Sequence, residues 1–124
     1  MFALDRTGET SLAPSAVTFG LSAAHVILCH KVIGDAGLRV EVTRGALEVA
    51  CNDIAEVLPQ VVVTSDAIGD EGLALLEDVA IAVGAVFLVL EESTTLDMIA
   101  LEIEAAVVVA AERVEYRSSH PPPS

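Results

Sequence analysis

The chain has 124 residues, of which 19 are acidic and 6 are basic, so its formal net charge is −13. This length suits one domain with a single core, and because 53% of the residues are hydrophobic but only 3% aromatic, the core must consist of Val, Leu, Ile and Ala. The charge argues against a nucleic-acid surface, which needs clustered Lys and Arg, and it disfavours an anionic membrane surface. No run approaches the ~18–20 apolar residues of a transmembrane span, and no secretory signal is recognised, so a cytoplasmic location is expected.

The first half of the chain contains two predicted strands, each followed by a helix. Residues 1–15 are rich in Thr, Ser, Gly and Pro and are predicted to form a flexible lead-in. A short strand is expected at 16–20, and Ser22 is a suitable N-cap for a helix over 23–33. Apolar and polar residues alternate over 38–43, which predicts a strand exposed on one face.

The centre of the chain shows the clearest pattern. Apolar residues recur at helical spacing from 46 until Pro59, which predicts an amphipathic helix. Residues 61–90 then contain a β-branched run, an amphipathic helix that stops at Gly84, and a second apolar run of strand length. A strand, a helix and a strand with short connections imply a right-handed crossover and a parallel sheet.

The C-terminal part is ambiguous. Leu96 and the apolar residues that follow it keep a helical register, but residues 107–114 could extend this helix or form a fifth strand, and their β-branched content favours the strand. Residues 115–124 are predicted to be a disordered tail, which leaves 16–114 as the domain. The predicted fold class is α/β, a single-domain, doubly wound and mainly parallel sheet of four to five strands, flavodoxin-like.

Acidic residues gather in the loops where parallel α/β sheets bind their ligands, at the carboxyl ends of the strands. Asp66 follows the third predicted strand, and Asp70, Glu71, Glu91 and Glu92 lie in loops of the same edge. Together they could hold a hard cation. A solvated acidic loop at a helix N-terminus is the favoured interpretation, because carboxylates there are stabilised by the helix dipole.

The cysteines and histidines offer weaker candidates. Cys29 and Cys51 are expected to be buried free thiols rather than a disulfide. His25 and Cys29 lie four residues apart on one predicted helix and could bind zinc, but no further ligands are evident, so core packing is favoured. The sequence has no phosphate-binding loop, dinucleotide fingerprint or nucleophile elbow, so the corresponding enzyme classes lack support.

The order and spacing of elements over residues 16–93 resemble the receiver domain of bacterial response regulators. The stretch AGLRVEVTRGALEVACNDIAEVLPQVVVTSD, residues 36–66, is similar to the second strand, second helix and third strand of that family, and Asp66 matches its phospho-acceptor. The resemblance implies a non-enzymatic module of two-component signal transduction and transcription regulation, which acts by protein–protein interaction and has Asp66 as its candidate phosphorylation site.

Three departures from the receiver pattern bear on the chemistry. Leu21 and Ser22 replace the paired acidic residues that bind magnesium, Glu91 stands at the switch Ser/Thr position, and no Lys follows Lys31, so the fifth-strand lysine is missing. Phosphoryl transfer depends on such charges. We therefore expect no cofactor, with magnesium binding only if Asp66 is phosphorylated, and a domain that works through its surfaces.

The segment 96–109 carries more apolar surface than a lone covering helix needs, which predicts an interface with a protein partner or a second copy of the chain. The candidate interface residues are Leu96, Met98, Ile99, Leu101 and Ile103.

Two other families are alternatives. Residues 43–58 and 68–76 resemble the STAS domain of anti-sigma-factor antagonists, with Asp70 in place of the phosphorylated Ser. In that interpretation residues 25–33 form a strand that pairs with 38–43, whereas the receiver interpretation makes 23–33 a helix. The alternation of strands and helices also resembles the phosphocarrier IIB domains of sugar phosphotransferase systems, an enzyme class, but Phe19 stands where their phosphorylated Cys would be.

Overall fold

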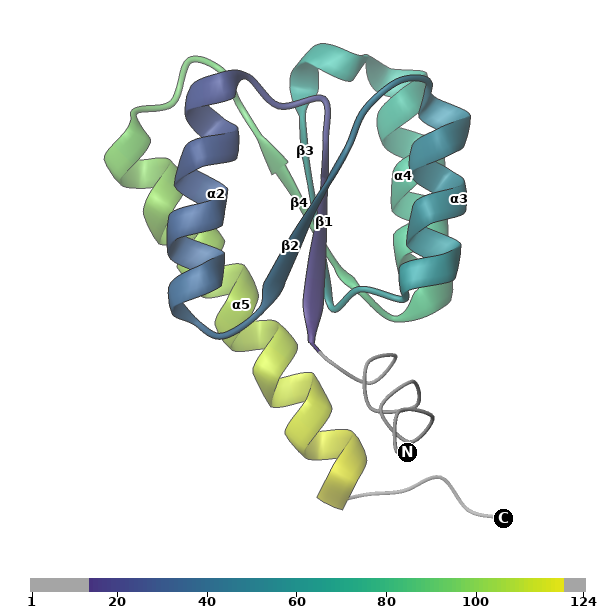
Figure 1. Ribbon diagram of the computed structural model, residues 1–124, viewed down its shortest axis with the longest axis vertical. Helices are drawn as coiled ribbons and strands as arrows, with labels where there is room; N and C mark the ends of the chain where they lie inside the picture. Colours follow the sequence, from purple (N-terminus) through teal and green to yellow (C-terminus); the bar gives the residue numbers. More distant parts are fainter. Residues whose placement is uncertain (1–13, 120–124) are drawn as a thin grey trace, which may run out of the picture.

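The computed structural model describes residues 14–119, which form a parallel four-stranded sheet covered by helices on both faces (Figure 1). In chain order the strands are β1 (Ser15–Phe19), β2 (Arg39–Thr43), β3 (Val61–Ser65) and β4 (Val86–Leu90), and their order in the sheet is β2-β1-β3-β4. One face carries helices α2 (Ala23–Asp35) and α5 (Leu96–Ser119), and the other carries α3 (Leu47–Val57) and α4 (Asp70–Val83). The doubly wound α/β fold predicted from the sequence is confirmed.

Two expectations concern residues at the ends of the chain. Most of the expected flexible lead-in, residues 1–13, and the last part of the expected tail, residues 120–124, lie outside the described residues. The intervening 115–119 were expected in the tail as well, but they continue helix α5.

The central strands β1 and β3 are buried along their whole length. Ala16, Val61 and Val63 face the core under α2 and α5, whereas Val17 and Val62 face the core under α3 and α4. Because side chains of a strand alternate between the two faces, a strand covered on both sides must be apolar at every position that packs. This explains the unbroken run of valines in β3.

The predicted fifth strand is wrong, because residues 107–114 belong to α5. Along this helix Ile103, Ala106, Val107 and Ala110 recur at spacings of three and four residues, and all four are buried against the sheet. Tertiary packing of one helical face therefore outweighs the β-propensity of the valines. The last turns of α5 project beyond the sheet (Figure 1).

The position of α5 also explains why the sheet ends at β4. A right-handed crossover from β4 to a further strand on its outer side would place the connecting helix on the same face as α4, which connects β3 to β4. Instead α5 lies on the face of α2 (Figure 1). Helix α5 therefore covers the core on the α2 side of the sheet, and β4 remains an edge strand.

The segment that separates the receiver interpretation from the STAS interpretation is a helix. Helix α2 covers residues 23–35, and the Ser22 side chain accepts a hydrogen bond from the backbone N–H of His25 at 3.3 Å, which caps the helix as predicted. The strand that a STAS fold requires at 25–33 is therefore absent.

The proposed interface on α5 needs a correction. Ile99 and Ile103 have no exposed surface, because they pack on the sheet in the same core as Ala16. Leu96, Met98 and Leu101 are 50%, 52% and 58% exposed and remain available for contact. The apolar residues of this segment thus lie on two different faces of α5. One face packs on the sheet and the other faces solvent.

Candidate functional site

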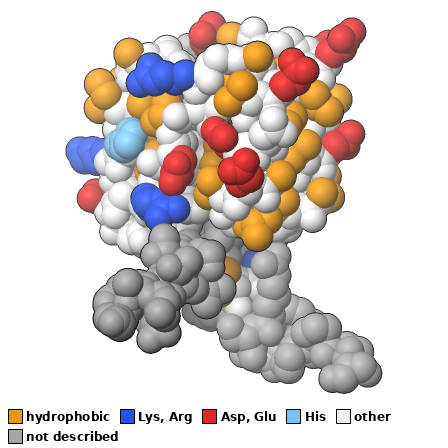
Figure 2. All heavy atoms as spheres, turned by 45° about the vertical axis from the view of Figure 1, so that its right-hand side comes forward, with side chains coloured by type: hydrophobic (Ala, Val, Ile, Leu, Met, Phe, Trp, Pro, Cys, Tyr) orange, Lys and Arg blue, Asp and Glu red, His pale blue; other side chains and the backbone are white. Residues whose placement is uncertain are grey.

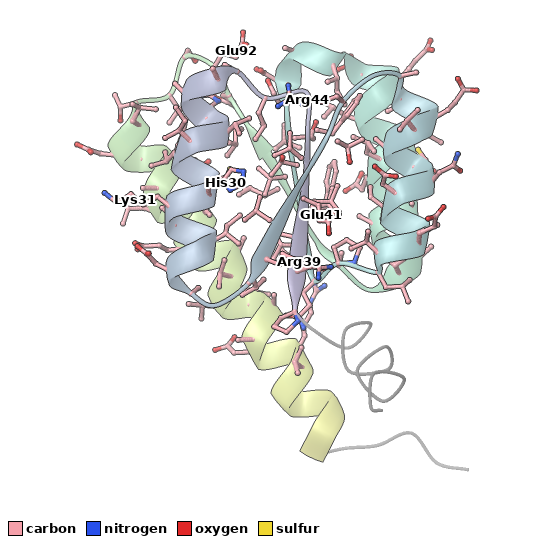
Figure 3. The ribbon with its side chains drawn as sticks, viewed as in Figure 1. His30, Lys31, Arg39, Glu41, Arg44 and Glu92 are labelled. Carbon is pink, nitrogen blue, oxygen red and sulfur yellow. The ribbon has the colours of Figure 1, made fainter. Side chains whose placement is uncertain are left out.

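The loops at the carboxyl ends of the strands form one edge of the sheet, where a ligand of this fold would bind. Arg44 follows β2 at this edge, and Glu92 lies in the loop between β4 and α5 (Figure 3). Because β2 and β4 are the two outer strands, these charges stand at opposite ends of the edge. The centre of the edge is formed by the loops after β1 and β3.

Asp66, the candidate phospho-acceptor, lies directly after β3 and begins a 3-10 turn, η1 (Asp66–Ile68). Its side chain is exposed, and its Oδ1 lies 3.5 Å from the Oγ of Ser65. The same Oγ accepts a hydrogen bond from the backbone N–H of Ala67 at 3.1 Å, which holds the turn. The structure thus presents one carboxylate to solvent at the end of β3.

The junction between β1 and β3 is closed by an apolar side chain. Ile68, at the end of η1, sits against Gly20, so that a Cβ added to Gly20 would lie 2.6 Å from Ile68 Cγ2. Ile68 also lies over Gly72 in α4. Below it, the Thr64 hydroxyl donates to the backbone carbonyl of Phe19 at 2.8 Å and ties the two strands together. Ile68 and its two glycines therefore form a plug, and the place next to the end of β1 is filled with hydrocarbon rather than with carboxylates.

The acidic residues are not brought together into a metal site. Within residues 14–119 no group of three or more His, Cys, Asp or Glu side chains has an arrangement that could hold an ion. Asp70 and Glu71 lie in the first turn of α4, where their charges favour the helix dipole. The structure therefore gives no preformed site for the hard cation considered at Asp66, Asp70, Glu71, Glu91 and Glu92, and the solvated-loop interpretation stays the favoured prediction.

The structure favours core packing over zinc binding for His25 and Cys29, because both are buried on the face of α2 that packs into the core.

Phosphocarrier chemistry and thiol catalysis also gain no support from the structure. Strand β1 ends in Phe19, and both cysteines lie within helices rather than at the carboxyl edge of the sheet.

The two free thiols differ in their surroundings. Burial raises the pKa of Cys29 from 9.0 to about 12. The pKa of Cys51, which is partly exposed, is also raised, first by burial and then by the charge of Glu48. Raised pKa values keep both groups as thiols at neutral pH, which makes them poor nucleophiles.

We expect Cys29 to react with iodoacetamide only when the chain unfolds. At pH 8 in native buffer, mass spectrometry should show slow labelling of Cys51 and none of Cys29, whereas both should be labelled in urea. The raised pKa of Cys29 also makes stability depend on pH, because the thiol ionises at a lower pH in the unfolded chain than in the folded protein. The free energy of unfolding should therefore fall as the pH rises from 9 toward 12, by up to about 1.4 kcal/mol per pH unit.

Cys29→Ala should flatten this alkaline loss of stability, measured by urea unfolding, and Cys51→Ser should leave most of it. Rapid labelling of Cys29 in the native chain would contradict its place in the core.

A hollow at the same edge was missed by the sequence analysis. It has a volume of about 350 Å³ and lies between α2 and the carboxyl ends of β1 and β2, with Leu21, Ile27, Val42 and Arg44 among its lining residues. None of its lining side chains is acidic, so it does not supply the missing metal ligands. Thr18 also lines the hollow, and its buried hydroxyl has no hydrogen-bond partner. The sequence gives no sign of this, because a Thr within an apolar strand is usually hydrogen-bonded when it is buried.

In the part of the chain that the structure describes, no helix combines the length and hydrophobicity needed to cross a membrane.

Comparison with known proteins finds similarity in structure only. No family model and no curated protein sequence matches this chain. The signal receiver domain of a protein assigned as a Luxo repressor from Vibrio parahaemolyticus matches with a TM-score of 0.58 and 16% identity, over 90% of this chain and 99% of that one. A response regulator from Thermotoga maritima matches with a TM-score of 0.52 and 13% identity, over 77% of this chain and 98% of that one. The chain therefore has the receiver fold, as the resemblance in sequence implied.

Proposed function

We propose that this chain is a receiver-like signal-transduction module that acts by contact with a protein partner, without catalysis and without magnesium-dependent phosphorylation. The shared fold with receiver domains supports the signalling role. The single observation that carries the contact mechanism is the position of Ile68 against Gly20, because the plug fills the space beside the end of β1.

The electrostatics of the edge support the same conclusion. Phosphoryl transfer to a carboxylate builds up negative charge, which metal ions and a nearby cation must offset. Asp66 is exposed, and no metal-binding group exists among residues 14–119. The only Lys of the chain, Lys31, points outward from α2 (Figure 3). An acyl phosphate on Asp66 would therefore lack the usual compensating charges.

The partner we infer is a protein. A net charge of −13 disfavours both nucleic acid and anionic lipid, since either would be repelled. A cytoplasmic location and a place in two-component regulation of transcription complete the proposal, on the strength of the receiver fold.

The deciding experiment is incubation with acetyl phosphate, and separately with beryllofluoride, in the presence of magnesium. We expect no added phosphoryl group by intact mass and no magnesium-dependent chemical-shift changes around Asp66, because the compensating charges are missing. The Asp66→Asn variant is the matched control and should give the same spectra. Phosphorylation of the wild-type chain that disappears in Asp66→Asn would overturn the proposal and make this a conventional receiver.

A further inference from the structure

Two buried polar groups without a partner lie beside the hollow between α2 and the ends of β1 and β2. Within residues 14–119 the buried side-chain atoms that lack a hydrogen bond are Thr18 Oγ1 and His25 Nδ1. Thr18 lines the hollow, and His25 lies in the first turn of α2, between the lining residues Ala23 and Val26 in the sequence. An unpaired buried polar group costs free energy, so most such groups have a partner. A molecule bound in the hollow could supply one.

The Thr18 side chain points toward α2. Ala16, two residues earlier on β1, packs in the core under α2, and side chains two apart on a strand share a face. Val42, the register partner of Thr18 on β2, also lines the hollow. Thr18 and Val42 therefore form its floor. Thr18 has no exposed surface, so a ligand reaches its hydroxyl by displacing a wall side chain, and Ile27 is 70% exposed and has room to turn.

The start of α2 supplies hydrogen-bond donors. Ser22 accepts from the N–H groups of His25 and Val26, whereas those of Ala23 and Ala24 have no partner among the described residues. Helix α2 has no acidic residue in its first turn, unlike α3, α4 and α5. The positive end of its dipole therefore has no compensating carboxylate of the helix itself, and it favours an anionic ligand.

Arg44 adds a positive charge to the hollow. It is one of the lining residues, and Figure 3 places it at the carboxyl edge of the sheet, where α2 also begins. Its side chain is exposed, and no ion pair within residues 14–119 involves it. None of the lining side chains is acidic. A guanidinium pairs with a carboxylate through two parallel hydrogen bonds, so Arg44 is suited to hold a carboxylate.

The charge of the whole chain limits which anion can bind. Acidic side chains are spread over the face shown in Figure 2, in keeping with the net charge of −13. At physiological salt, exposed charges more than about 8 Å away are largely screened, so the residues that line the hollow matter most. One arginine balances one negative charge, but not the roughly two charges of a phosphate group. A singly charged carboxylate is therefore favoured.

We propose that this hollow binds a small organic monocarboxylate with a short hydrocarbon body. The carboxylate pairs with Arg44, with the free N–H groups at the start of α2 and with the Thr18 hydroxyl. The hydrocarbon body packs on Leu21 and Ile27. A volume of about 350 Å³ lies at the small end of ligand pockets, which suits such a molecule.

This site is separate from the candidate phosphorylation site. The hollow lies on the β2 side of β1, whereas Asp66 follows β3, on the other side of β1. Ligand binding thus goes beyond the contact function proposed above, and it does not depend on whether Asp66 accepts a phosphoryl group.

An NMR titration of the full chain with hexanoate tests the proposal. We expect saturable shifts of the backbone amide signals of Gly20, Ala23 and Ala24, with a dissociation constant on the order of a millimolar. Hexanamide has nearly the same shape without the charge, and acetate has the charge without the body. Both should bind at least about tenfold more weakly, because each lacks one of the two features that the hollow recognises.

A pair of charge variants tests the role of Arg44. Arg44→Gln should raise the dissociation constant for hexanoate about tenfold, because the ligand loses its charged partner. Lys31→Gln is the matched control. It removes the same charge, but Lys31 points outward from α2 (Figure 3), so the constant should change less than about twofold.

Thr18→Val tests the floor of the hollow, since it removes the hydroxyl and keeps the shape of the side chain. Because this hydroxyl has no partner in the empty protein, the variant should be at least as stable as the wild-type chain in urea unfolding. Its dissociation constant for hexanoate should rise at least about threefold. A hydroxyl with a purely structural role would give lower stability and unchanged binding.

Four results would each overturn the proposal. Hexanoate gives no saturable shifts in the high millimolar range, hexanamide binds as well as hexanoate, Arg44→Gln behaves like Lys31→Gln, or Thr18→Val binds hexanoate like the wild-type chain. None of them would alter the outcome of the acetyl phosphate experiment, so the two proposals can fail separately.

Discussion

Replacing Gly20 by Ala should lower the free energy of unfolding by about 2–4 kcal/mol. Two costs add up at this position. Gly20 has a φ of +73°, a left-handed conformation that Ala adopts only with strain, and the new Cβ would lie 2.6 Å from Ile68 Cγ2. Urea unfolding followed by circular dichroism measures the loss.

Gly37→Ala is the matched control, because Gly37 also has a positive φ, +92°, but no atom within 4 Å of the added Cβ. It should cost only the backbone strain, about 1 kcal/mol. In an Ile68→Ala background, which has a stability cost of its own, Gly20→Ala should cost no more than Gly37→Ala, because the side chain that the new Cβ would meet is gone. Equal losses in Gly20→Ala and Gly37→Ala would mean that Ile68 does not close the end of β1, and the main support for a phosphorylation-independent module would disappear.

Replacing Ile103 by Ala should cost about 2–5 kcal/mol of stability, whereas Leu101→Ala should change it by less than about 0.5 kcal/mol. The two residues lie only two positions apart on α5, but Ile103 is fully buried against the sheet and Leu101 is 58% exposed. A buried side chain loses its transfer free energy and leaves a cavity, while an exposed one loses little.

The comparison tests the orientation of α5, because Ile103 and Leu101 are equally apolar in sequence. Chemical denaturation of both variants, with the same denaturant dependence as the wild-type chain, gives the two values. Similar losses for both variants would place Leu101 in a buried contact, and dilution could then show whether this contact is made by a second copy.

Local pattern was sufficient for the greater part of the fold. The unbroken valines of β3, the helical spacing up to Pro59 and the stop at Gly84 predicted strands and helices that the structure contains. These features depend on neighbours a few residues apart, through capping, side-chain period and the conformational freedom of glycine. The same reasoning placed Asp66 directly after β3, where the structure has it.

Local pattern failed where two elements compete for the same residues. The valines at 107–109 have high β-propensity, yet they form α5 because Ile99, Ile103 and Ala110 bury one helical face. The acidic residues could be counted in sequence, but their distances could not, so a cation site was considered that the fold does not assemble.

Periodicity along the chain decided the four strand–helix units and their parallel arrangement, because each unit must bury an apolar face of its own. Contacts between distant segments decided the rest. Ile68 meets Gly20 only because β3 pairs with β1, and β4 is an open edge only because α5 crosses to the face of α2. Neither fact has a signature in sequence, since each depends on a packing choice of the whole sheet.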